Sequence, residues 1–375
     1  MIYDYIFCGF GLSTLLVLEE FEVQNLLVGK SILILEKEAS FPEKTWCFWE
    51  RGVGKWDDLL SGMWSKGYVK DEFQRVEVLD GLLYKCLPSA ALRNRMMEKL
   101  QNYNCVFKNQ KTISWDDCGD RVVVRTESQS YTSQFFFNSS YTAIDHQIQS
   151  NVLLQHFEGW FVKTKSPAFI PSEALIMDFS VAQKGNTRFM YVLPFSETTA
   201  LVEYTLFSPS LIPEKEYADE IHGYLEDRNI TEFEITAKEF GVIPMTVHPF
   251  WKQNTRNVLH IGTAGGWTKA STGYTFKTAE KYASKLATML NDNPCDFSKF
   301  YEQSRFNWYD SLFIDVLHRD NKIGKNLFMS LFTKARSNEV MAFLHEETTL
   351  IEEIGIIANC PQRPFLAALG RKLFT

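Results

Sequence analysis

A glutamate between apolar neighbours is the side chain best suited to acid chemistry. Glu203 lies in Leu201-Val202-Glu203-Tyr204-Thr205, which has the composition of a β-strand. If the face of the strand that carries Glu203 lines an enclosed cavity, burial raises the pKa of the carboxyl group, which then serves as a general acid at neutral pH. The alternative is a solvent-facing glutamate on a half-exposed sheet. Strand alternation gives Glu203 four neighbours on its own face: Thr199, Leu201, Thr205 and Phe207.

Two glycines in Gly9-Phe10-Gly11-Leu12-Ser13 have the spacing of a dinucleotide-binding turn. The apolar segment Tyr3–Cys8 precedes the turn, and Leu12–Phe21 has the pattern of a helix. The first glycine allows the tight turn, and the second allows the backbone to approach a pyrophosphate at the helix N-terminus. Thr14 replaces the third glycine of the usual fingerprint, which predicts a slightly displaced helix rather than lost binding.

A second buried strand completes this unit. Ser31–Leu35 is apolar and ends at Glu36, where an acidic side chain can hydrogen-bond a ribose hydroxyl. The alternative is a plain glycine turn and a solvated strand end. The order of strand, turn, helix, strand and acid favours the first interpretation and predicts six cofactor-binding residues: Gly9, Gly11, Leu12, Ser13, Glu36 and Lys37.

Another glycine-rich turn follows an apolar strand late in the chain. The predicted strand is Asn257–Ile261, and a helix is predicted from Thr272-Gly273 to about Leu290. Flavoproteins close over the flavin with such a segment, because backbone amides at a helix start can face the pyrophosphate, the ribityl chain or the isoalloxazine. The alternative is an ordinary glycine-rich loop. The predicted cofactor-binding residues here are Gly262, Gly265, Gly266, Thr272, Gly273 and Tyr274.

The remaining segments must position these groups. We predict an α/β fold in which a Rossmann-like FAD-binding domain (residues 1–50, 82–150 and 255–293) is interleaved with a mixed-sheet substrate domain (51–81 and 151–254). Helical periodicity dominates a C-terminal region, 294–375. The expected helices in that region are Phe297–Leu317, Asn321–Lys334, Asn338–Leu344, Thr348–Ala358 and Phe365–Phe374; others are expected at Leu87–Leu100 and between Glu214 and Asp227.

The composition excludes several classes of protein. The chain has 375 residues with 39 basic and 46 acidic side chains, so its net charge of −7 argues against a general nucleic-acid binder. Seven cysteines are never spaced C-x-x-C, which indicates reduced cytoplasmic thiols, no disulfide framework and no metal site. No segment has the roughly 18 to 20 uninterrupted apolar residues of a spanning helix. We expect a cytoplasmic protein that at most lies on a membrane.

Two further features suggest contact with apolar ligands or lipid. The 30 Phe, 15 Tyr and 9 Trp exceed what a core needs, which indicates an apolar cavity, membrane contact or simply a Phe-rich lineage. His318–Arg336 has five basic residues and one acid around the apolar segment Leu327–Phe332. Such a segment can lie in the interface of an anionic bilayer, and the alternative is a core-facing helix with a solvated charged face.

Seven motifs in order along the chain carry a resemblance to a known family. The sequence resembles the bacterial lycopene β-cyclases, within the wider family of flavin-dependent cyclases and geranylgeranyl-reductase-like flavoproteins. The match covers most of residues 1–290, whereas 294–375 matches in helical character more than in motif. The motifs are Gly9-Phe10-Gly11-Leu12-Ser13, Lys44-Thr45-Trp46-Cys47-Phe48, Leu175-Ile176-Met177-Asp178, Tyr191-Val192-Leu193-Pro194-Phe195, Leu201-Val202-Glu203-Tyr204-Thr205, Gly241-Val242-Ile243-Pro244 and the segment from Gly262 to Phe276.

The resemblance implies an isomerase that converts the acyclic ψ end groups of lycopene into β-ionone rings, giving γ-carotene and β-carotene with no net redox change. It implies that FAD acts in its reduced form, with NAD(P)H as the expected reductant. Glu203 is then expected to protonate lycopene or another acyclic carotene. A partner of this solubility implies a cytoplasmic protein that is peripherally associated with the inner face of the membrane.

The sequence also departs from the family pattern. The family commonly has a Glu-Asp pair in the strand motif, whereas Tyr204 holds the second position here and leaves Glu203 as the single acid. Gly262-Thr263 stands where flavin hydroxylases have Gly-Asp, which favours a cyclase. The rival functions are an FAD-dependent prenyl-chain reductase or hydroxylase of the same fold, and a carotenoid- or lipid-binding flavoprotein without turnover.

Overall fold

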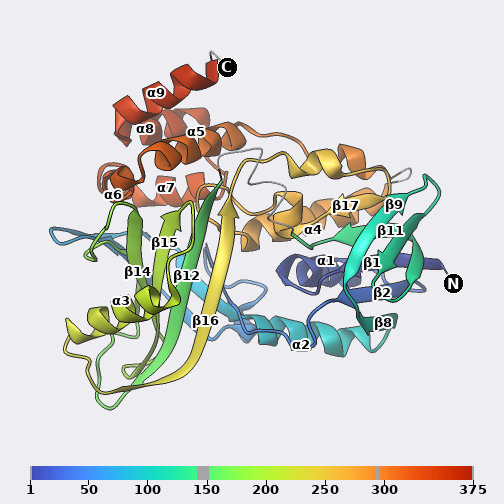
Figure 1. The fold of residues 1–375 in the computed structure, drawn as a ribbon, viewed down its shortest axis with the longest axis horizontal. Coiled ribbons are helices and arrows are strands. Elements are labelled where there is room, and N and C mark those ends of the chain that lie inside the picture. Colours follow the sequence, from blue (N-terminus) through green and yellow to red (C-terminus); the bar gives the residue numbers. More distant parts are fainter. Residues whose placement is uncertain (1, 142–151, 293–294, 374–375) are drawn as a thin grey trace.

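The computed structural model describes residues 2–141, 152–292 and 295–373, and it contains three β-sheets with helices packed around them (Figure 1). The domain boundaries expected at 150/151 and 293/294, and the helix end expected at Phe374, lie outside the described residues. The proposed division of the chain into domains stays a prediction. The pairing of the strands shows which segments support each wall of the site.

The first sheet is built mainly from parallel strands. Its order is β8-β2-β1-β11-β10-β9, with β17 paired to β11, and only β9, β10 and β11 are joined by antiparallel pairing. The strands are β1 (Ile2–Cys8), β2 (Ser31–Glu36), β8 (Asn104–Asn109), β9 (Thr112–Asp117), β10 (Val122–Thr126), β11 (Ser130–Asn138) and β17 (Val258–His260). The helices beside this sheet are α1 (Leu12–Val23), α2 (Ser89–Leu100) and α4 (Phe276–Asn291) (Figure 1).

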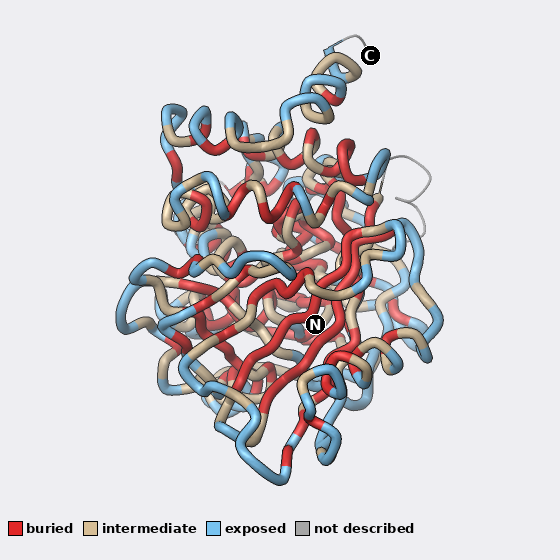
Figure 2. The backbone as a smooth tube through the Cα atoms, turned by 90° about the vertical axis from the view of Figure 1, so that its left-hand side faces the viewer, coloured by how far each residue is buried: buried red, intermediate tan, exposed pale blue. Residues whose placement is uncertain are grey.

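Helix α1 is buried on nearly every side because it contacts the sheet, α2 and α4. Leu15, Leu16 and Phe21 belong to the core of this part of the molecule, and the interior strands are correspondingly buried (Figure 2). Even Glu19 is only 4% exposed, and the Lys99 ammonium from α2 lies 3.0 Å from its carboxylate. The predicted strand–turn–helix–strand unit is therefore formed by the described residues, as the alternation of apolar segments and glycines indicated.

The second sheet is almost entirely antiparallel. Its order is β16-β12-β15-β14-β13-β5-β6, and only β5 and β13 pair in parallel. Helix α3 (Glu214–Glu226) packs on one face of β12 and β15. The strands are β5 (Lys66–Lys70), β6 (Arg75–Glu77), β12 (Leu153–Thr164), β13 (Glu173–Asp178), β14 (Thr187–Pro194), β15 (Thr199–Ser208) and β16 (Phe233–Met245).

A small third sheet joins the two larger parts. It consists of β3 (Thr45–Glu50), β7 (Leu83–Pro88) and β4 (Gly62–Trp64), in the order β3-β7-β4. The helix expected from Leu87 begins at Ser89 instead, because the chain up to Pro88 is paired with β3. The short 3-10 helices are η1 (Asp57–Leu59), η2 (Phe250–Gln253), η3 (Gly262–Gly265), η4 (Phe297–Lys299) and η5 (Asn321–Ile323).

The C-terminal region is helical, as predicted. One correction concerns its first helix, which was expected from Phe297 but begins at Arg305. Ser304 and Asn307 form a capping box that starts the helix there. The helices are α5 (Arg305–Arg319), α6 (Gly324–Lys334), α7 (Ser337–Leu344), α8 (Leu350–Asn359) and α9 (Gln362–Leu373).

Helix α6 decides between the two interpretations of the basic segment. Five of its apolar side chains are buried and pack against the second sheet and α7, and Lys325 and Arg319 are ion-paired with Glu72 and Asp315. The core-facing alternative is therefore correct for this helix. Its buried side chains are Leu327, Phe328, Met329, Leu331 and Phe332.

Candidate active site

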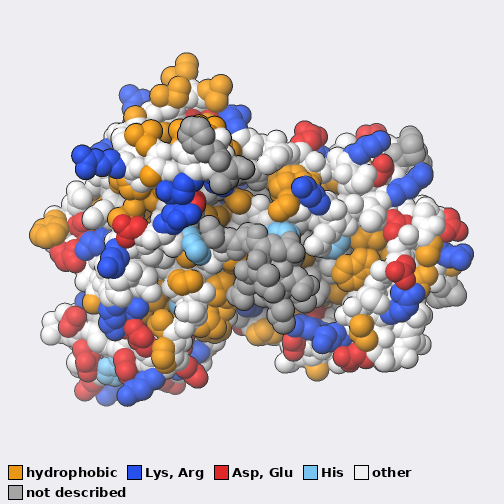
Figure 3. All heavy atoms as spheres, turned by 45° about the horizontal axis from the view of Figure 1, so that its top comes forward, with side chains coloured by type: hydrophobic (Ala, Val, Ile, Leu, Met, Phe, Trp, Pro, Cys, Tyr) orange, Lys and Arg blue, Asp and Glu red, His pale blue; other side chains and the backbone are white. Residues whose placement is uncertain are grey.

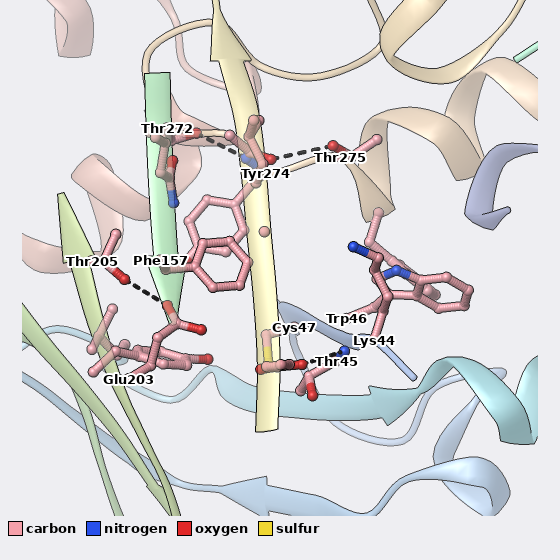
Figure 4. A pocket seen from close by; sticks show the side chains of 18 of the residues that line it. Lys44, Thr45, Trp46, Cys47, Phe157, Glu203, Thr205, Thr272, Tyr274 and Thr275 are labelled. Atoms are coloured by element: carbon pink, nitrogen blue, oxygen red, sulfur yellow. Dashed lines mark hydrogen bonds between the residues drawn. The ribbon is translucent and has the colours of Figure 1, made fainter. Parts of the chain in front are cut away.

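A pocket of about 420 Å³ is lined by residues of all three sheets and of the C-terminal helices (Figure 4). One wall is mostly backbone and comes from the two glycine-rich turns, at residues 11–13, 262–263 and 272–275. The opposite wall consists of side chains from β12, β15 and β16, with Glu203 among them. The wall of turns and the wall of side chains therefore face one space, and its volume is typical of a small-molecule site.

The first turn leaves the N-terminus of α1 open. Gly11 is the N-cap residue of α1, where no side chain caps the helix, and a Cβ placed on Gly11 would meet nothing within 4 Å. Gly9 has φ +89°, and a Cβ there would collide with the Ser139 hydroxyl. Uncapped backbone N–H groups at a helix start attract anions, so this turn fits a pyrophosphate.

Thr14 closes the turn from below. Its hydroxyl donates a hydrogen bond of 2.8 Å to the carbonyl oxygen of Gly9, and the residue is fully buried. A threonine therefore occupies the position of the third glycine by bonding to the turn that precedes the helix. The expected small displacement of the helix stays a prediction.

Glu36 and Lys37 lie outside the pocket wall. The Glu36 carboxylate accepts hydrogen bonds from the backbone N–H groups of Phe10 at 2.8 Å and Glu38 at 3.1 Å, so it stabilises the glycine turn. Lys37 is exposed and lies 3.5 Å from the Glu38 carboxylate. Contact of Glu36 with a ribose hydroxyl stays a prediction.

The late glycine turn packs directly on the first. Gly262 has φ +62°, and a Cβ there would lie 2.7 Å from the Ser13 hydroxyl oxygen. Gly273 has φ +75°, and a Cβ there would collide with the Gln155 side chain in the pocket wall. Because Gly273 has a left-handed backbone, the helix expected from this point begins three residues later, at Phe276.

Two of the predicted glycines do not line the pocket. A Cβ on Gly265 would collide with the backbone carbonyl of His260, and Gly266 has φ +73° with Phe250 next to it. Close packing and backbone conformation account for glycine at both positions. Their contact with a cofactor stays a prediction, whereas Gly262, Thr272, Gly273 and Tyr274 line the pocket.

Glu203 lies in the pocket wall and is 8% exposed (Figure 4). The Thr205 hydroxyl donates a hydrogen bond of 2.6 Å to its carboxyl group. Burial, reinforced by the charge of Glu239, raises the pKa of Glu203 to about 8, so the group holds a proton at neutral pH. The solvent-facing alternative is not what the structure contains, because Leu201, Thr205 and Phe207 line the same pocket, as strand alternation predicted.

A second carboxyl group in the pocket was missed by the sequence analysis. Glu239 on β16 is half-buried, and it accepts a hydrogen bond of 3.2 Å from the backbone N–H of Thr45. Burial raises its pKa to about 7, against the opposing effects of Thr45 and the Lys44 charge. Only the pairing of β12 with both flanking strands brings Glu239 and Glu203 to one place, so no local pattern indicated it.

Tyr204 points away from the pocket, toward α3. Its ring lies in the core that α3 forms with the second sheet, and the Arg188 guanidinium donates a hydrogen bond of 3.0 Å to its hydroxyl. The adjacent position of the family's Glu-Asp pair thus belongs to the opposite face of the strand. Asp178 is equally remote from the pocket wall and is fully buried between Lys70 and Arg228, 3.2 and 2.9 Å away, which makes it a structural ion pair.

Aromatic rings and three hydroxyl groups form the inner part of the pocket. The Tyr84 hydroxyl is hydrogen-bonded to the hydroxyls of Tyr191 at 2.9 Å and Tyr274 at 3.1 Å. The ring of Trp49 meets Tyr274 edge-on at 4.6 Å. Rings and apolar side chains keep water out and present π-faces that attract a cation. The other apolar lining includes Phe157, Phe189, Phe207, Phe328, Phe332, Met341 and Leu344.

The pocket fits a dinucleotide cofactor with a polar ring system. The side-chain oxygen of Gln155 is buried at the pocket wall without a hydrogen-bond partner among the described residues, and it lies beside Gly273. An acceptor in this position can bind a ring N–H group, while the open turn at Gly11 can hold the pyrophosphate. Within the described ranges, no group of three or more His, Cys, Asp or Glu is placed to bind a metal ion.

Solved structures of the same fold are flavoproteins. A flavoprotein/dehydrogenase from Cytophaga hutchinsonii matches with a TM-score of 0.62 and 10% identity, over 99% of this chain and 100% of that one. A geranylgeranyl bacteriochlorophyll reductase-like protein from Thermoplasma acidophilum gives 0.58 and 9%, over 98% and 96%. Halogenase PltM, in complex with phloroglucinol and FAD, gives 0.59 and 14%, over 98% and 86%. The chain thus has the Rossmann-like α/β fold of FAD-dependent flavoproteins.

The family is narrower than the fold. The family model described as "Lycopene cyclase protein" matches residues 4–369, and the chain belongs to that family. A lycopene beta-cyclase of Paracoccus sp. (strain N81106 / MBIC 01143) is 30% identical over 138 residues, 36% of this chain and 35% of the relative. A lycopene beta-cyclase of Pantoea ananas is 25% identical over 209 residues, 53% and 54% of the two chains. The matched regions span about a third and about half of these curated relatives.

Proposed function

We propose that this protein is a lycopene β-cyclase, an isomerase that converts the ψ end groups of lycopene into β rings beside reduced FAD. The observation that carries the proposal is the buried Glu203 carboxyl in an aromatic pocket whose other wall is formed by two glycine turns. Membership of the lycopene cyclase family and the lycopene beta-cyclase relatives support the same substrate.

The cyclisation is an acid-initiated reaction of a hydrocarbon. Glu203 donates a proton to the terminal double bond, and a tertiary cation forms at the neighbouring carbon. The internal double bond attacks that cation and closes the ring, after which a proton leaves. The rings of Trp49, Tyr84 and Tyr191 exclude water and stabilise the cation, and each favourable face is worth about 2 kcal/mol when desolvated.

The cofactor wall supports this chemistry by placing charge. Backbone N–H groups at the start of α1 would hold the pyrophosphate, and Gln155 and the 272–275 turn would bind the ring system. A bound reduced flavin supplies negative charge beside the developing cation. Because the reaction has no net redox change, NAD(P)H would serve to reduce the flavin and would not be consumed with each ring formed.

The proposal is tested with purified protein, FAD, a reductant and lycopene in lipid vesicles. Formation of γ-carotene and β-carotene is the expected result, with far less than one equivalent of reductant oxidised per ring. Saturated or hydroxylated products, formed in proportion to reductant or oxygen, would assign the rival function of a prenyl-chain reductase or hydroxylase, which the reductase-like fold neighbour makes the second candidate. Recovery of unchanged lycopene would favour a binding protein.

We also propose that the protein acts on the inner face of a membrane, because its substrate is dissolved there. Among the described residues, no helix is both long and apolar enough to span a bilayer. Helix α8 instead presents a surface face of apolar side chains, with Ile351 83% and Ile354 68% exposed. Leu350 and Ile357 extend this face at helical spacing.

Two observations make lipid the occupant of the α8 face. Helix α8 packs on α6 and α7, whose side chains Phe332 and Leu344 line the pocket, so a hydrocarbon entering here has a short path. Exposed Arg363 and Lys372 on α9 add positive charge next to the apolar residues Leu366 and Leu373, as an anionic bilayer surface requires. Figure 3 shows hydrophobic side chains with basic ones beside them at the end of the molecule formed by these helices.

A further inference from the structure

Two carboxyl groups of the pocket meet over a single glycine. In the second sheet, Gly159 of β12 pairs with Glu203 on β15 and with Glu239 on β16. Since neighbouring strands are about 4.8 Å apart, the backbones of the two glutamates are separated by about 10 Å with Gly159 between them. Residues that pair in this way point to the same face of the sheet, and both carboxyl groups line the pocket.

The absence of a side chain at Gly159 lets the two glutamates approach each other. A Cβ on Gly159 would lie 3.2 Å from Cγ of Glu239, 3.5 Å from Cβ of Glu203 and 2.9 Å from Cδ1 of Leu201. The two glutamates therefore extend over the glycine from opposite sides. Any larger residue would stand between them, and Gly159 has no left-handed backbone that would explain glycine otherwise.

The surroundings of the two groups differ in a way that assigns their protonation. Glu239 accepts a hydrogen bond from the Thr45 backbone N–H and lies near the Lys44 charge, with Glu43 opposing them. Glu203 is more deeply buried and has only the Thr205 hydroxyl as its donor. An N–H group and a cation stabilise a carboxylate, so Glu239 ionises first and Glu203 keeps the proton.

We propose that Glu239 is the general base of the cyclisation and that it forms a proton-exchanging pair with Glu203. This inference rests on the proposed function. The O–H bond of Glu203 breaks as a C–H bond forms at the terminal double bond, and the internal double bond closes the ring and leaves a cation. A C–H bond next to that cation then breaks; its electrons form the ring double bond, and the proton goes to the Glu239 carboxylate.

After one turnover Glu239 holds the proton and Glu203 is ionised, so a transfer between them restores the starting state. Atoms and electrons balance, and no oxidant or reductant is used. The carbon that gains a proton and the carbon that loses one belong to the same six-membered ring, so the acid and the base must be close neighbours. Two glutamates over one glycine meet that requirement.

The test compares Glu239→Gln with Glu234→Gln, a matched change at an exposed position of the same strand. We expect Glu239→Gln to lower ring formation by about 10²-fold or more, in the range of acid–base catalysis, and to keep bound FAD and thermal stability. The ring that does form should contain isomers with a displaced double bond, since the proton acceptor is gone. Glu239→Asp, which retains a carboxylate, should exceed Glu239→Gln.

The pH dependence gives a readout that a structural role would not change. The base must be ionised, so the wild-type rate should rise through about pH 7, and Glu239→Gln should lose this limb. The groups that face the pair are Lys44, Glu43 and Cys47 near Glu239, and Thr205 and Tyr274 near Glu203. Removing the Glu239 charge should also shift the upper limb, set by Glu203, to lower pH.

Gly159→Ala provides an independent variant, since it should separate the pair without removing either carboxyl group. It should lower the rate while FAD stays bound. Wild-type rates, an unchanged acid limb and pure β rings in Glu239→Gln would overturn the inference. If the wild-type protein itself forms no ring, the proposed function fails instead, so the two failures are distinguishable.

Discussion

The two walls of the pocket are built in different ways. The cofactor wall is formed by short contiguous turns, 9–13 and 262–275, in which backbone atoms and glycine conformations do the binding. The substrate wall is formed by single side chains from strands far apart in sequence, such as Glu203 and Glu239, which become neighbours only through sheet pairing. The first wall specifies a cofactor by its backbone, and the second specifies a reaction by its side chains.

This difference predicts how mutations act. A substitution in the cofactor wall changes backbone geometry or fills the space of a ligand, so it should affect flavin binding and stability. A substitution of a carboxyl group in the substrate wall leaves the backbone intact, so it should affect turnover and leave flavin binding unchanged.

The largest effect is expected for Glu203→Gln. This change keeps the shape of the side chain and removes the acidic proton, so ring formation should fall by about 10²–10⁴-fold. Flavin binding, measured by its absorbance after gel filtration, should match that of the wild-type protein. Near-normal cyclisation by Glu203→Gln would contradict the assignment of the acid and would remove the chemical difference between the walls.

The cofactor wall is probed by Gly9→Ala and Gly11→Ala. A Cβ on Gly9 collides with Ser139 at φ +89°, so about 1–3 kcal/mol of strain should lower both stability and FAD affinity. Gly11 has an extended backbone and open space around it, so Gly11→Ala should keep the melting temperature and lose FAD affinity alone. Isothermal titration with FAD and thermal melts separate the two. Unchanged FAD affinity in Gly11→Ala would show that no ligand approaches there.

The alkaline pH limb measures how strongly the substrate wall perturbs its acid. Glu203 must be protonated to act, and burial raises its pKa to about 8, so activity should be retained at pH 7 and fall as the pH rises through about 8. The protonated fraction then drops about tenfold between pH 7 and pH 9. A limb near pH 4.5, the range of an exposed glutamate, would contradict burial of the acid in the working enzyme.

The smallest effect is expected at the membrane surface. Ile354→Glu on α8 should weaken binding to anionic vesicles by about tenfold, since an apolar side chain of this size contributes about 1.5–3 kcal/mol when buried. Ile113→Glu is the matched control, because Ile113 is 61% exposed on β9 in the other part of the molecule. Cosedimentation with vesicles at low and high salt provides the measurement. Equal losses in both variants would contradict docking through α8.

Helices α6 and α8 show how far sequence patterns could be taken. Both alternate apolar and polar residues, and the sequence favoured a surface role for α6 because basic residues flank Leu327–Phe332. In the structure α6 faces the core, whereas α8 has Ile351 and Ile354 on the surface. A pattern defines one apolar face on a helix, but the neighbours that cover that face come from other parts of the chain.

The same limit applies to the site. Alternation along one strand correctly placed Glu203 with Leu201 and Thr205, and the glycine turns were recognised because their conformations are local. Tyr204 was recognised as a departure from the family, but its position on the opposite face explains why an acid there would not reach the pocket. Glu239 could not be found, because its sequence neighbours Lys238 and Phe240 are typical of an exposed strand.

The sequence by itself determined the βαβ unit, the glycine turns and the face of the strand that carries Glu203, since backbone preference and side-chain periodicity act over a few residues. Only the tertiary structure decided that Glu239 joins Glu203 over Gly159, and that α8 is the helix with an uncovered apolar face. Distances across strands and between helices depend on the packing of segments up to hundreds of residues apart, and this packing is set by the burial of the whole core.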